Sequence, residues 1–428
     1  MRLILLITLL ATILRLYIFF DFAPACCGSD EGVYHKIAVN FLQKGEMFIT
    51  KEDEPRLWKD IIYGAKPPFY SFFLANVYKI TGPNYNAARI IQIFISAVTG
   101  IFLYLITKEL FSEKIGIVAL IVYSFFLEIA FMSIAILSEN IYWFLISMLI
   151  YLLIKIKKYG ARLEIFAGLT LGLLVLTRPT AIVFLPIIVI WLLWKNVKVV
   201  NIKNALIFIS FLLIALIPWN LRNYKIYEQF VFSYTDGGIN IWMGNHAMGV
   251  GNYNIPKLNN PDQTPILKTK GIKQEIERDN FYYNQAFEYM KKNPTSTFDL
   301  AIKKVFGTFS LYRQPMINIT KSKGEFILIR PKAFMVDSLL EFLITYQYTI
   351  FVVSFLLSVL YLIKINNLNI LNSLLLLLIV GNLLSIAISH YEFRYIMQLY
   401  PLMIPFSALI IHLFWITIFS KNKENIKL

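Results

Sequence analysis

Apolar residues fall in long blocks that short charged or glycine-rich connections separate. Several blocks approach the roughly 20 residues that a helix needs to cross a bilayer. The blocks cover residues 3–21, 87–107, 115–134, 139–156, 161–177, 180–195, 204–220, 343–363, 370–389 and 395–419. This pattern predicts an all-α polytopic membrane protein with about ten transmembrane helices.

The composition agrees with a lipid environment and changes how the charge is interpreted. Of the 428 residues, 57% are hydrophobic and only 16% are charged, while the net charge is +15. A basic soluble protein would suggest nucleic acid, but no basic-aromatic motif of that kind occurs. Many of the lysines flank apolar blocks instead, so we predict a membrane partner and no nucleic acid.

The distribution of lysines predicts the orientation in the membrane. With the N-terminus in the cytoplasm, the lysine-rich short turns near residues 108–114, 155–162, 195–203 and 364 all lie inside, as the positive-inside rule requires. The first block is longer than a signal-peptide core and predicts an uncleaved anchor. We therefore expect a multi-pass protein of the cell membrane whose functional surface faces the extracytoplasmic side.

Two long connections divide the chain into three predicted parts. Residues 1–220 form an N-terminal transmembrane module of seven spans that includes the outer loop 22–86. Residues 221–335 form a large extracytoplasmic loop region, in which 272–292 and 295–312 have helical periodicity. Residues 336–428 contain the C-terminal transmembrane helices.

An acidic pair, Asp30 and Glu31, follows the first block. Val33, Ile37 and Phe41 then recur at four-residue spacing, which predicts an amphipathic helix on the membrane surface that ends near residue 45. Acids suit the first turn of a helix, where backbone N–H groups are unpaired. Alternatively, Asp30 is a general base for an acceptor hydroxyl, and apolar surroundings raise its proton affinity. Both interpretations stay open.

Several cations occur at the predicted outer ends of spans. They are Lys66 in "KPPFY", Arg178 in "TRPT", Arg222 in "PWNLRNY" and Arg394 in "HYEFRY". Each alone is typical of a side chain that reaches for the membrane surface. Gathered at one depth, they favour a phosphate carried on a lipid, because arginine binds phosphate oxygens in pairs.

Three further side chains are candidates for the same site. Glu139 in "LSEN" is either a helix cap or a catalytic partner, and Tyr34 lies on the same predicted helix as Asp30. Asn245 lies in "GGINIWMGN", which is either a cradle for a sugar or phosphate or a plain turn-rich loop. The histidines have no zinc-site spacing, so we predict no cofactor and no dedicated metal site, although first-loop carboxylates could hold a divalent cation.

The order of "DEGVY", "KPPFY", "GPNYNAARIIQ", "LSEN", "LTRPTA", "PWNLRNY" and "FRYIMQLYPLMIP" resembles GT-C glycosyltransferases of the protein-mannosyltransferase and aminoarabinose-transferase type, over residues 1 to about 410. The resemblance implies transfer of a sugar from a polyprenyl-phosphate donor to an outer acceptor, with inversion. It matches Asp30 to the catalytic acidic residue and Lys66 to a lysine that contacts the lipid phosphate. It leaves the acceptor open between protein, lipid and polysaccharide.

The chain is therefore expected to be a glycosyltransferase in which Asp30, helped by Glu31 or Glu139, removes the acceptor proton. The alternative is a transporter or flippase, which would show similar halves and ionisable groups deep inside its spans. The two halves here are unlike, but Arg15 and Glu128 do lie within apolar stretches. A binding or assembly subunit with a decayed site is a third class.

Overall fold

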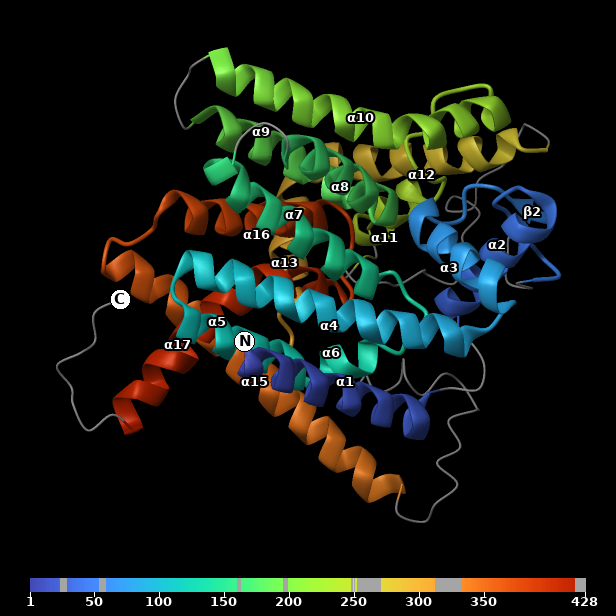
Figure 1. Ribbon diagram of the computed structural model, residues 1–428. Helices are drawn as coiled ribbons and strands as arrows, with labels where there is room; N and C mark the ends of the chain where they lie inside the picture. The colour runs from blue at the N-terminus through green and yellow to red at the C-terminus, as the bar shows by residue number, and fades with distance from the viewer. Residues whose placement is uncertain are drawn as a thin grey trace.

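The computed structural model describes residues 1–23, 29–53, 59–159, 163–194, 199–247, 249, 251, 271–311 and 333–419. Figure 1 shows a bundle of long helices with smaller elements gathered at one end. Within these residues the strands are β1 (Ile49–Thr50) and β2 (Ile61–Ile62), an antiparallel pair. The expected all-α membrane fold is confirmed.

Seven helices of the described chain are long and apolar enough to cross a membrane. They lie in α1 (Arg2–Phe22), α4 (Tyr85–Leu110), α7 (Glu139–Tyr159), α10 (Val199–Tyr227), α15 (Ala333–Lys364), α16 (Ile370–Ile388) and η3 (Tyr395–Leu399) with α17 (Tyr400–Phe419). The other three predicted blocks form shorter apolar helices: α5 (Glu113–Phe125) with α6 (Leu127–Met132), α8 (Leu163–Thr177), and η1 (Pro179–Val183) with α9 (Phe184–Trp194). Every apolar block is thus helical, because a helix satisfies its own backbone polar groups in lipid.

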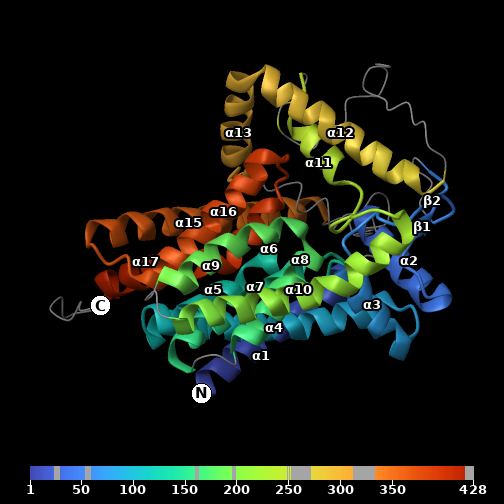
Figure 2. The same ribbon diagram turned by 90° about the horizontal axis from the view of Figure 1, so that it is seen from above.

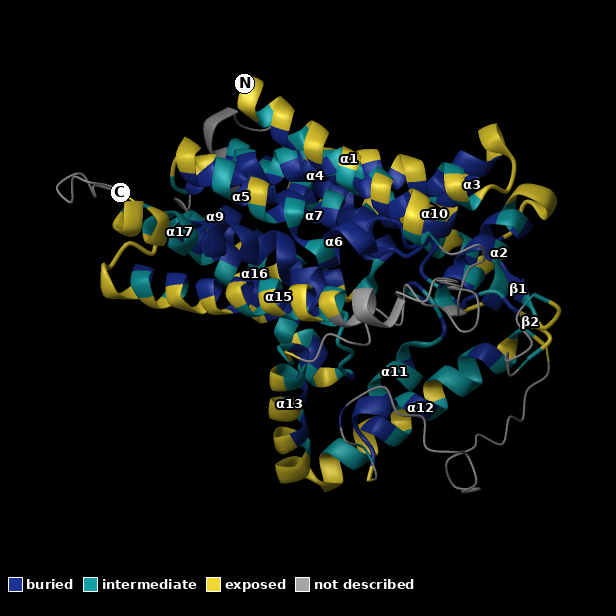
Figure 3. Ribbon diagram, turned by 90° about the horizontal axis from the view of Figure 1, so that it is seen from below, coloured by how far each residue is buried: buried dark blue, intermediate teal, exposed yellow. Residues whose placement is uncertain are grey.

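Close packing of small residues holds the centre of the bundle together. Gly168 and Gly172 lie one turn apart on α8, and a Cβ at either position would collide with Phe208 or Ala215 of α10. Glycine lets the two backbones approach, as is typical of helix pairs in membranes. Figure 3 shows the buried centre and the exposed outer faces of α1 and α15, whose apolar side chains suit lipid.

Arg15 is buried in the bundle, where it satisfies the end of an interrupted helix. Its guanidinium donates to the carbonyl oxygens of Ser124 (2.8 Å) and Tyr123 (3.2 Å) in the last turn of α5. The Gln347 side chain bridges the break between α5 and α6, since it donates to the Phe125 carbonyl and accepts from the Leu127 amide. Of the two intramembrane groups that suggested a transport path, Arg15 therefore stabilises a helix end, and Glu128 accepts a hydrogen bond from the Tyr400 hydroxyl.

The smaller elements form what we call the loop end of the bundle. The helices α2 (Ser29–Lys44) and α3 (Pro68–Thr81) pack on each other, and α2 ends before Gly45, whose φ of +76° suits glycine. Within the large connection, α11 (Gly237–Gly244), α12 (Lys273–Lys292) and α13 (Pro294–Thr308) form a separate group. Figure 2 shows these three standing away from the spans, with α12 reaching toward β1 and β2. The three-part division of the chain remains a prediction.

Candidate active site

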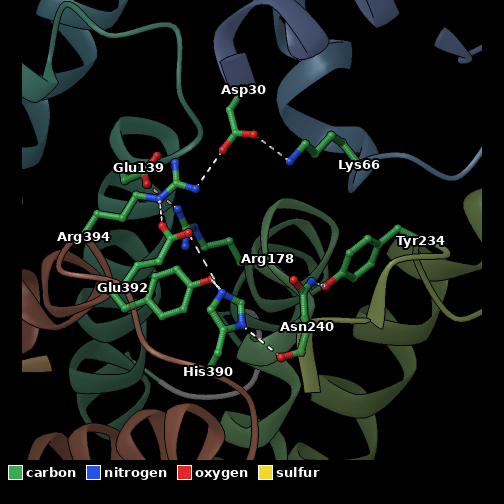
Figure 4. A network of polar contacts seen from close by, with 10 residues as sticks. Asp30, Lys66, Glu139, Arg178, Tyr234, Asn240, His390, Glu392 and Arg394 are labelled. Carbon is green, nitrogen blue, oxygen red and sulfur yellow. Dashed lines mark hydrogen bonds and ion pairs between the residues drawn. The ribbon is translucent and has the colours of Figure 1, made fainter. Parts of the chain in front are cut away.

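Asp30 lies between two cations from distant parts of the chain. Its Oδ1 is 3.0 Å from Lys66 Nζ, and its Oδ2 is 2.8 Å from Arg394 Nη2. Figure 4 shows the carboxylate pointing between the two side chains. The structure thus brings together three of the predicted site residues.

Each of these three residues stands at the start of a helix. Asp30 is in the first turn of α2, and Arg394 directly precedes η3. Lys66 precedes Pro67 and Pro68, whose rings fix the backbone that opens α3. In the first turn of α2, unpaired backbone N–H groups also favour the negative charge of Asp30.

The charges control the ionisation of Asp30. Lys66 lowers the pKa of the Asp30 carboxyl well below its usual range; burial opposes this effect, and Arg394 adds to the lowering. Burial would lower the pKa of Lys66, but Asp30 raises it above its ordinary value. The expectation that apolar surroundings raise the proton affinity of Asp30 is therefore wrong for this arrangement, because the adjacent cations outweigh burial.

Glu392 holds the side chain of Arg394 from the other side. Its Oε2 accepts from Arg394 Nε at 2.5 Å, which leaves Nη2 directed at Asp30. Arg394 thus contacts two carboxylates through two different guanidinium nitrogens, Nε and Nη2. The single ammonium group of a lysine cannot reproduce this geometry. Sequence reasoning missed Glu392, although it stands two residues before Arg394 in the same motif.

His390 extends the network toward α11. Its Nδ1 lies 3.0 Å from the Asn240 carbonyl oxygen, so this nitrogen carries the proton, and Nε2 accepts from the Tyr395 hydroxyl at 2.9 Å. Burial lowers the pKa of His390 and favours this neutral form. His390 was considered in the sequence only as a metal ligand.

Glu139 and Arg178 form a second ion pair beside Arg394. Arg178 Nη2 lies 2.5 Å from Glu139 Oε1, and Glu139 is only 1% exposed. The Glu139 Oε2 atom and the Arg178 Nε atom are buried without hydrogen-bond partners among the described residues. Figure 4 shows this pair directly behind Arg394. Polar atoms buried without partners are uncommon and suit a site that receives a ligand.

Glu31 and Tyr34 lie on the same helix as Asp30 but have other contacts. Glu31 Oε1 accepts from the Ile136 amide at 2.7 Å, which ties α2 to the segment after α6. The Tyr34 ring packs edge-on against Tyr70, and Lys66 Nζ lies 5.8 Å from its centre. Tyr34 is thus next to the cation site, whereas the Glu31 carboxylate serves an anchoring contact.

Arg222 and Asn245 are not brought to Asp30 by any of their hydrogen bonds. Arg222 donates to the carbonyl oxygens of Met47 (2.6 Å) and Tyr63 (3.2 Å). Asn245 Oδ1 accepts from Lys304 Nζ at 2.9 Å, and its amide donates to the carbonyl oxygen at the end of α16. Both residues connect loops in this structure, and Arg222 holds the segment that leads to Lys66.

Glu275 of α12 binds the segment that leads to Lys66, and this residue was not identified from the sequence. It is completely buried and accepts from the amides of Tyr63 and Gly64 at 3.1 Å each. It also accepts from the hydroxyl groups of Tyr227 (2.8 Å) and Thr235 (3.1 Å). The large connection therefore clamps the chain two residues before Lys66.

The described residues contain no group of three or more His, Cys, Asp and Glu side chains that could hold a metal ion. Both oxygens of Asp30 contact cationic side chains, which also disfavours a divalent ion at this carboxylate. The suggestion of a divalent cation in the first loop stays a prediction.

An apolar cavity of about 320 Å³ lies between α3, α4, α7 and α8. Its lining begins at Phe69, in the first turn of α3, three residues after Lys66. Further lining residues are Phe73, Ile95, Ile141, Phe144, Leu145, Met148, Phe166, Leu169, Thr170 and Leu173. The apolar cavity therefore has a lining residue three positions after Lys66 in the chain.

Residues 65–220 match the family model of dolichyl-phosphate-mannose-protein mannosyltransferases. Two structures of the oligosaccharyltransferase from Archaeoglobus fulgidus, one of them with zinc and sulfate and the other with an inhibitory peptide and a dolichol phosphate, match 97% and 99% of this chain. Both have a TM-score of 0.54, with sequence identities of 13% and 12%. The chain has the GT-C fold.

The resemblance expected from the motifs is confirmed at the level of this fold. The chain spans about half the length of the archaeal enzyme, 49% and 52% in the two structures. ArnT from Cupriavidus metallidurans, solved with undecaprenyl phosphate, is a weaker match at a TM-score of 0.41 and 12% identity, with 95% of this chain and 77% of that chain covered. A search of curated protein sequences finds no match. The matched family model and the archaeal enzyme are named as glycosyltransferases, and the transporter alternative is not favoured.

Proposed function

We propose that the chain is an integral membrane glycosyltransferase that moves a sugar from a polyprenyl-phosphate donor to an acceptor on the extracytoplasmic side. The observation that carries this proposal is the placement of Asp30 between Lys66 and Arg394. A base and two phosphate-binding cations are the parts that such a transfer requires.

The donor phosphate takes the place that the Asp30 carboxylate holds in this structure. Lys66 and Arg394 exchange one anion for another, and Arg178 adds a third positive charge nearby. The prenyl chain enters the apolar cavity that begins at Phe69. The binding of dolichol phosphate by the archaeal enzyme of the same fold supports this donor class.

Donor binding also prepares the base. When phosphate engages Lys66 and Arg394, the interactions that lower the pKa of Asp30 weaken, and its proton affinity rises. Asp30 then accepts the proton of the acceptor hydroxyl as the acceptor oxygen bonds to the anomeric carbon. The bond from that carbon to the phosphate oxygen breaks, and the cations stabilise the departing phosphate. Attack opposite the leaving group inverts the anomeric centre.

The orientation follows from charge and from chemistry. Four lysines lie at helix ends beside the short connections, which are cytoplasmic under the positive-inside rule: Lys108, Lys114, Lys155 and Lys364. With these ends inside, α2 and α3 face outward. Nucleotide sugars are cytoplasmic, so an outward-facing site needs a sugar that already rides on a lipid.

The test is release of free polyprenyl phosphate by the purified protein in proteoliposomes supplied with a panel of polyprenyl-phosphate sugars and hydroxyl acceptors. The proposal expects release that depends on an acceptor and one glycosylated product per phosphate freed. Movement of the intact donor across the membrane without release would instead support the flippase alternative.

A further inference from the structure

The helix α13 turns its apolar side outward. Phe298, Ile302 and Phe306 recur at four-residue spacing and are 66%, 41% and 73% exposed. The opposite side, which packs against the protein, buries Leu300, Lys304 and Thr308. Figure 3 shows exposed residues along α13. Three large apolar side chains thus face outward while a lysine and a threonine are buried, which is unlike a helix at a protein surface in water, where the charged residues are outside.

The attachment of α13 fixes its depth relative to the spans. Lys304 Nζ donates to the Ala387 carbonyl at 2.8 Å, one residue before the end of α16. Gly307 lies so close to the Tyr391 ring that an added Cβ would come within 2.6 Å of it. Figure 2 shows α13 running across the direction of α15 and α17. The helix therefore lies where α16 ends and its chain leaves the apolar layer.

The surroundings of the apolar stripe match the boundary of a bilayer. Leu384 and Ile388, in the last turns of α16, are also 56% and 53% exposed, as suits a span that faces lipid. Lys303 and Asp299 are exposed along one edge of the stripe, and Lys291 and Lys292 are exposed just before α13. An apolar strip bordered by lysines is typical of helices that lie in an interface with anionic headgroups.

We propose that α13 is an interfacial helix whose Phe298, Ile302 and Phe306 side chains enter the lipid layer at the loop end of the bundle. This inference does not depend on the sugar, the acceptor or the transfer reaction. Through Lys304, which also donates to Asn245, the helix holds the segment after α11 at the level of the membrane surface. The large connection is thereby anchored to lipid as well as to the spans.

The experiment places a nitroxide label at one of two adjacent positions, Ile302→Cys or Lys303→Cys, in a full chain whose Cys26 and Cys27 are serine. The protein is placed in nanodiscs of phosphatidylcholine and phosphatidylglycerol. Power-saturation electron paramagnetic resonance then compares relaxation by oxygen, which concentrates in lipid, with relaxation by a water-soluble nickel chelate. We expect the oxygen-to-nickel ratio to be several-fold higher at position 302 than at 303.

A label at Phe306→Cys gives an independent reading and should agree with position 302. Equal nickel accessibility at 302 and 303 would mean that the stripe faces water and would overturn the proposal. Exclusion of both reagents from 302 and 306 would mean that protein, such as a second copy, covers the stripe and would also overturn it. Neither readout requires catalysis, so the outcome is separate from that of the proposed transferase activity.

Discussion

Asp30 Oδ2 accepts a hydrogen bond from Arg394 Nη2 at 2.8 Å across 364 residues of sequence. The contact joins the first helix of the loop end to the start of the last span. Lys66 occupies the other carboxylate oxygen, so the carboxylate stands where an anionic ligand would meet both cations. The site is therefore an assembled cation pair with an internal anion bound in it.

Replacing Lys66 with alanine should raise the KM for the donor far more than the KM for the acceptor. A hydrogen bond from a charged group to phosphate contributes about 2 kcal/mol, which corresponds to roughly thirtyfold. The measurement is initial-rate kinetics with each substrate varied in turn. Lys79→Ala is the matched control, because Lys79 is exposed in the last turn of α3, the helix that follows Lys66. Equal losses for donor and acceptor would argue against a phosphate contact.

Replacing Arg394 with lysine should lower transferase activity, although the positive charge is kept. Arg394 serves Glu392 with Nε and Asp30 with Nη2, and an ammonium cannot reach both in this geometry. We expect kcat/KM to fall by roughly tenfold or more, with a further fall for Arg394→Ala. A lysine variant with the wild-type kcat/KM would show that only the charge matters.

Replacing Glu275 with alanine should destabilise the loop end and weaken donor binding. The substitution leaves two amides and two hydroxyls without their buried acceptor, at a cost of about 1–3 kcal/mol for each unsatisfied group. In Glu275→Ala the melting temperature should fall and the donor KM should rise. Glu275→Gln keeps one acceptor oxygen, so its donor KM should rise less. Glu288→Gln on the exposed face of α12 is the control and should change neither. An unchanged donor KM in Glu275→Ala would show that the contacts of Glu275 do not position Lys66 for donor binding.

The stability of the fold around α11 and α12 should fall as the pH rises, because the buried Asp279 carboxyl must then become charged. Burial raises the pKa of Asp279 to about 7, against a hydrogen bond from the Gly238 amide that lowers it. Because the folded-state pKa lies above the ordinary value, this group's stabilising contribution is full below about pH 4 and is lost as the pH rises through 7. Melting temperatures measured from pH 5 to 8.5 should therefore fall less for Asp279→Asn than for the wild type. Parallel curves for the two proteins would contradict this assignment.

The sequence predicted the helices well because membrane spans are a local property. A block of apolar residues must satisfy its own backbone in lipid, so its position in the sequence is enough to identify it. The end of the first outer helix near residue 45 was predicted for an equally local reason, since a glycine follows α2 there. The interrupted helix α5–α6 was not predicted, because the residues that complete it, Arg15 and Gln347, come from other spans.

The candidate site depended on contacts that no local pattern contains. Arg222 and Arg394 look alike in the sequence, as arginines at the ends of apolar blocks, but only Arg394 meets Asp30. No local pattern indicates that Glu275, in the first turn of the polar helix α12, is buried. Its burial results from the packing of α12 against the first outer loop. The direction of the pKa change at Asp30 was wrong for the same reason, since it depends on which cations arrive beside the carboxylate.

The most direct test of the central claim measures donor affinity and turnover together in Asp30→Asn. The account predicts that turnover is lost by at least about a thousandfold, since no base remains. It also predicts that the polyprenyl-phosphate sugar binds as tightly as to the wild type or more tightly, because a neutral amide no longer competes with phosphate for Lys66 and Arg394. An active Asn variant, or an inactive one that fails to bind the donor although it is folded and inserted, would contradict the account.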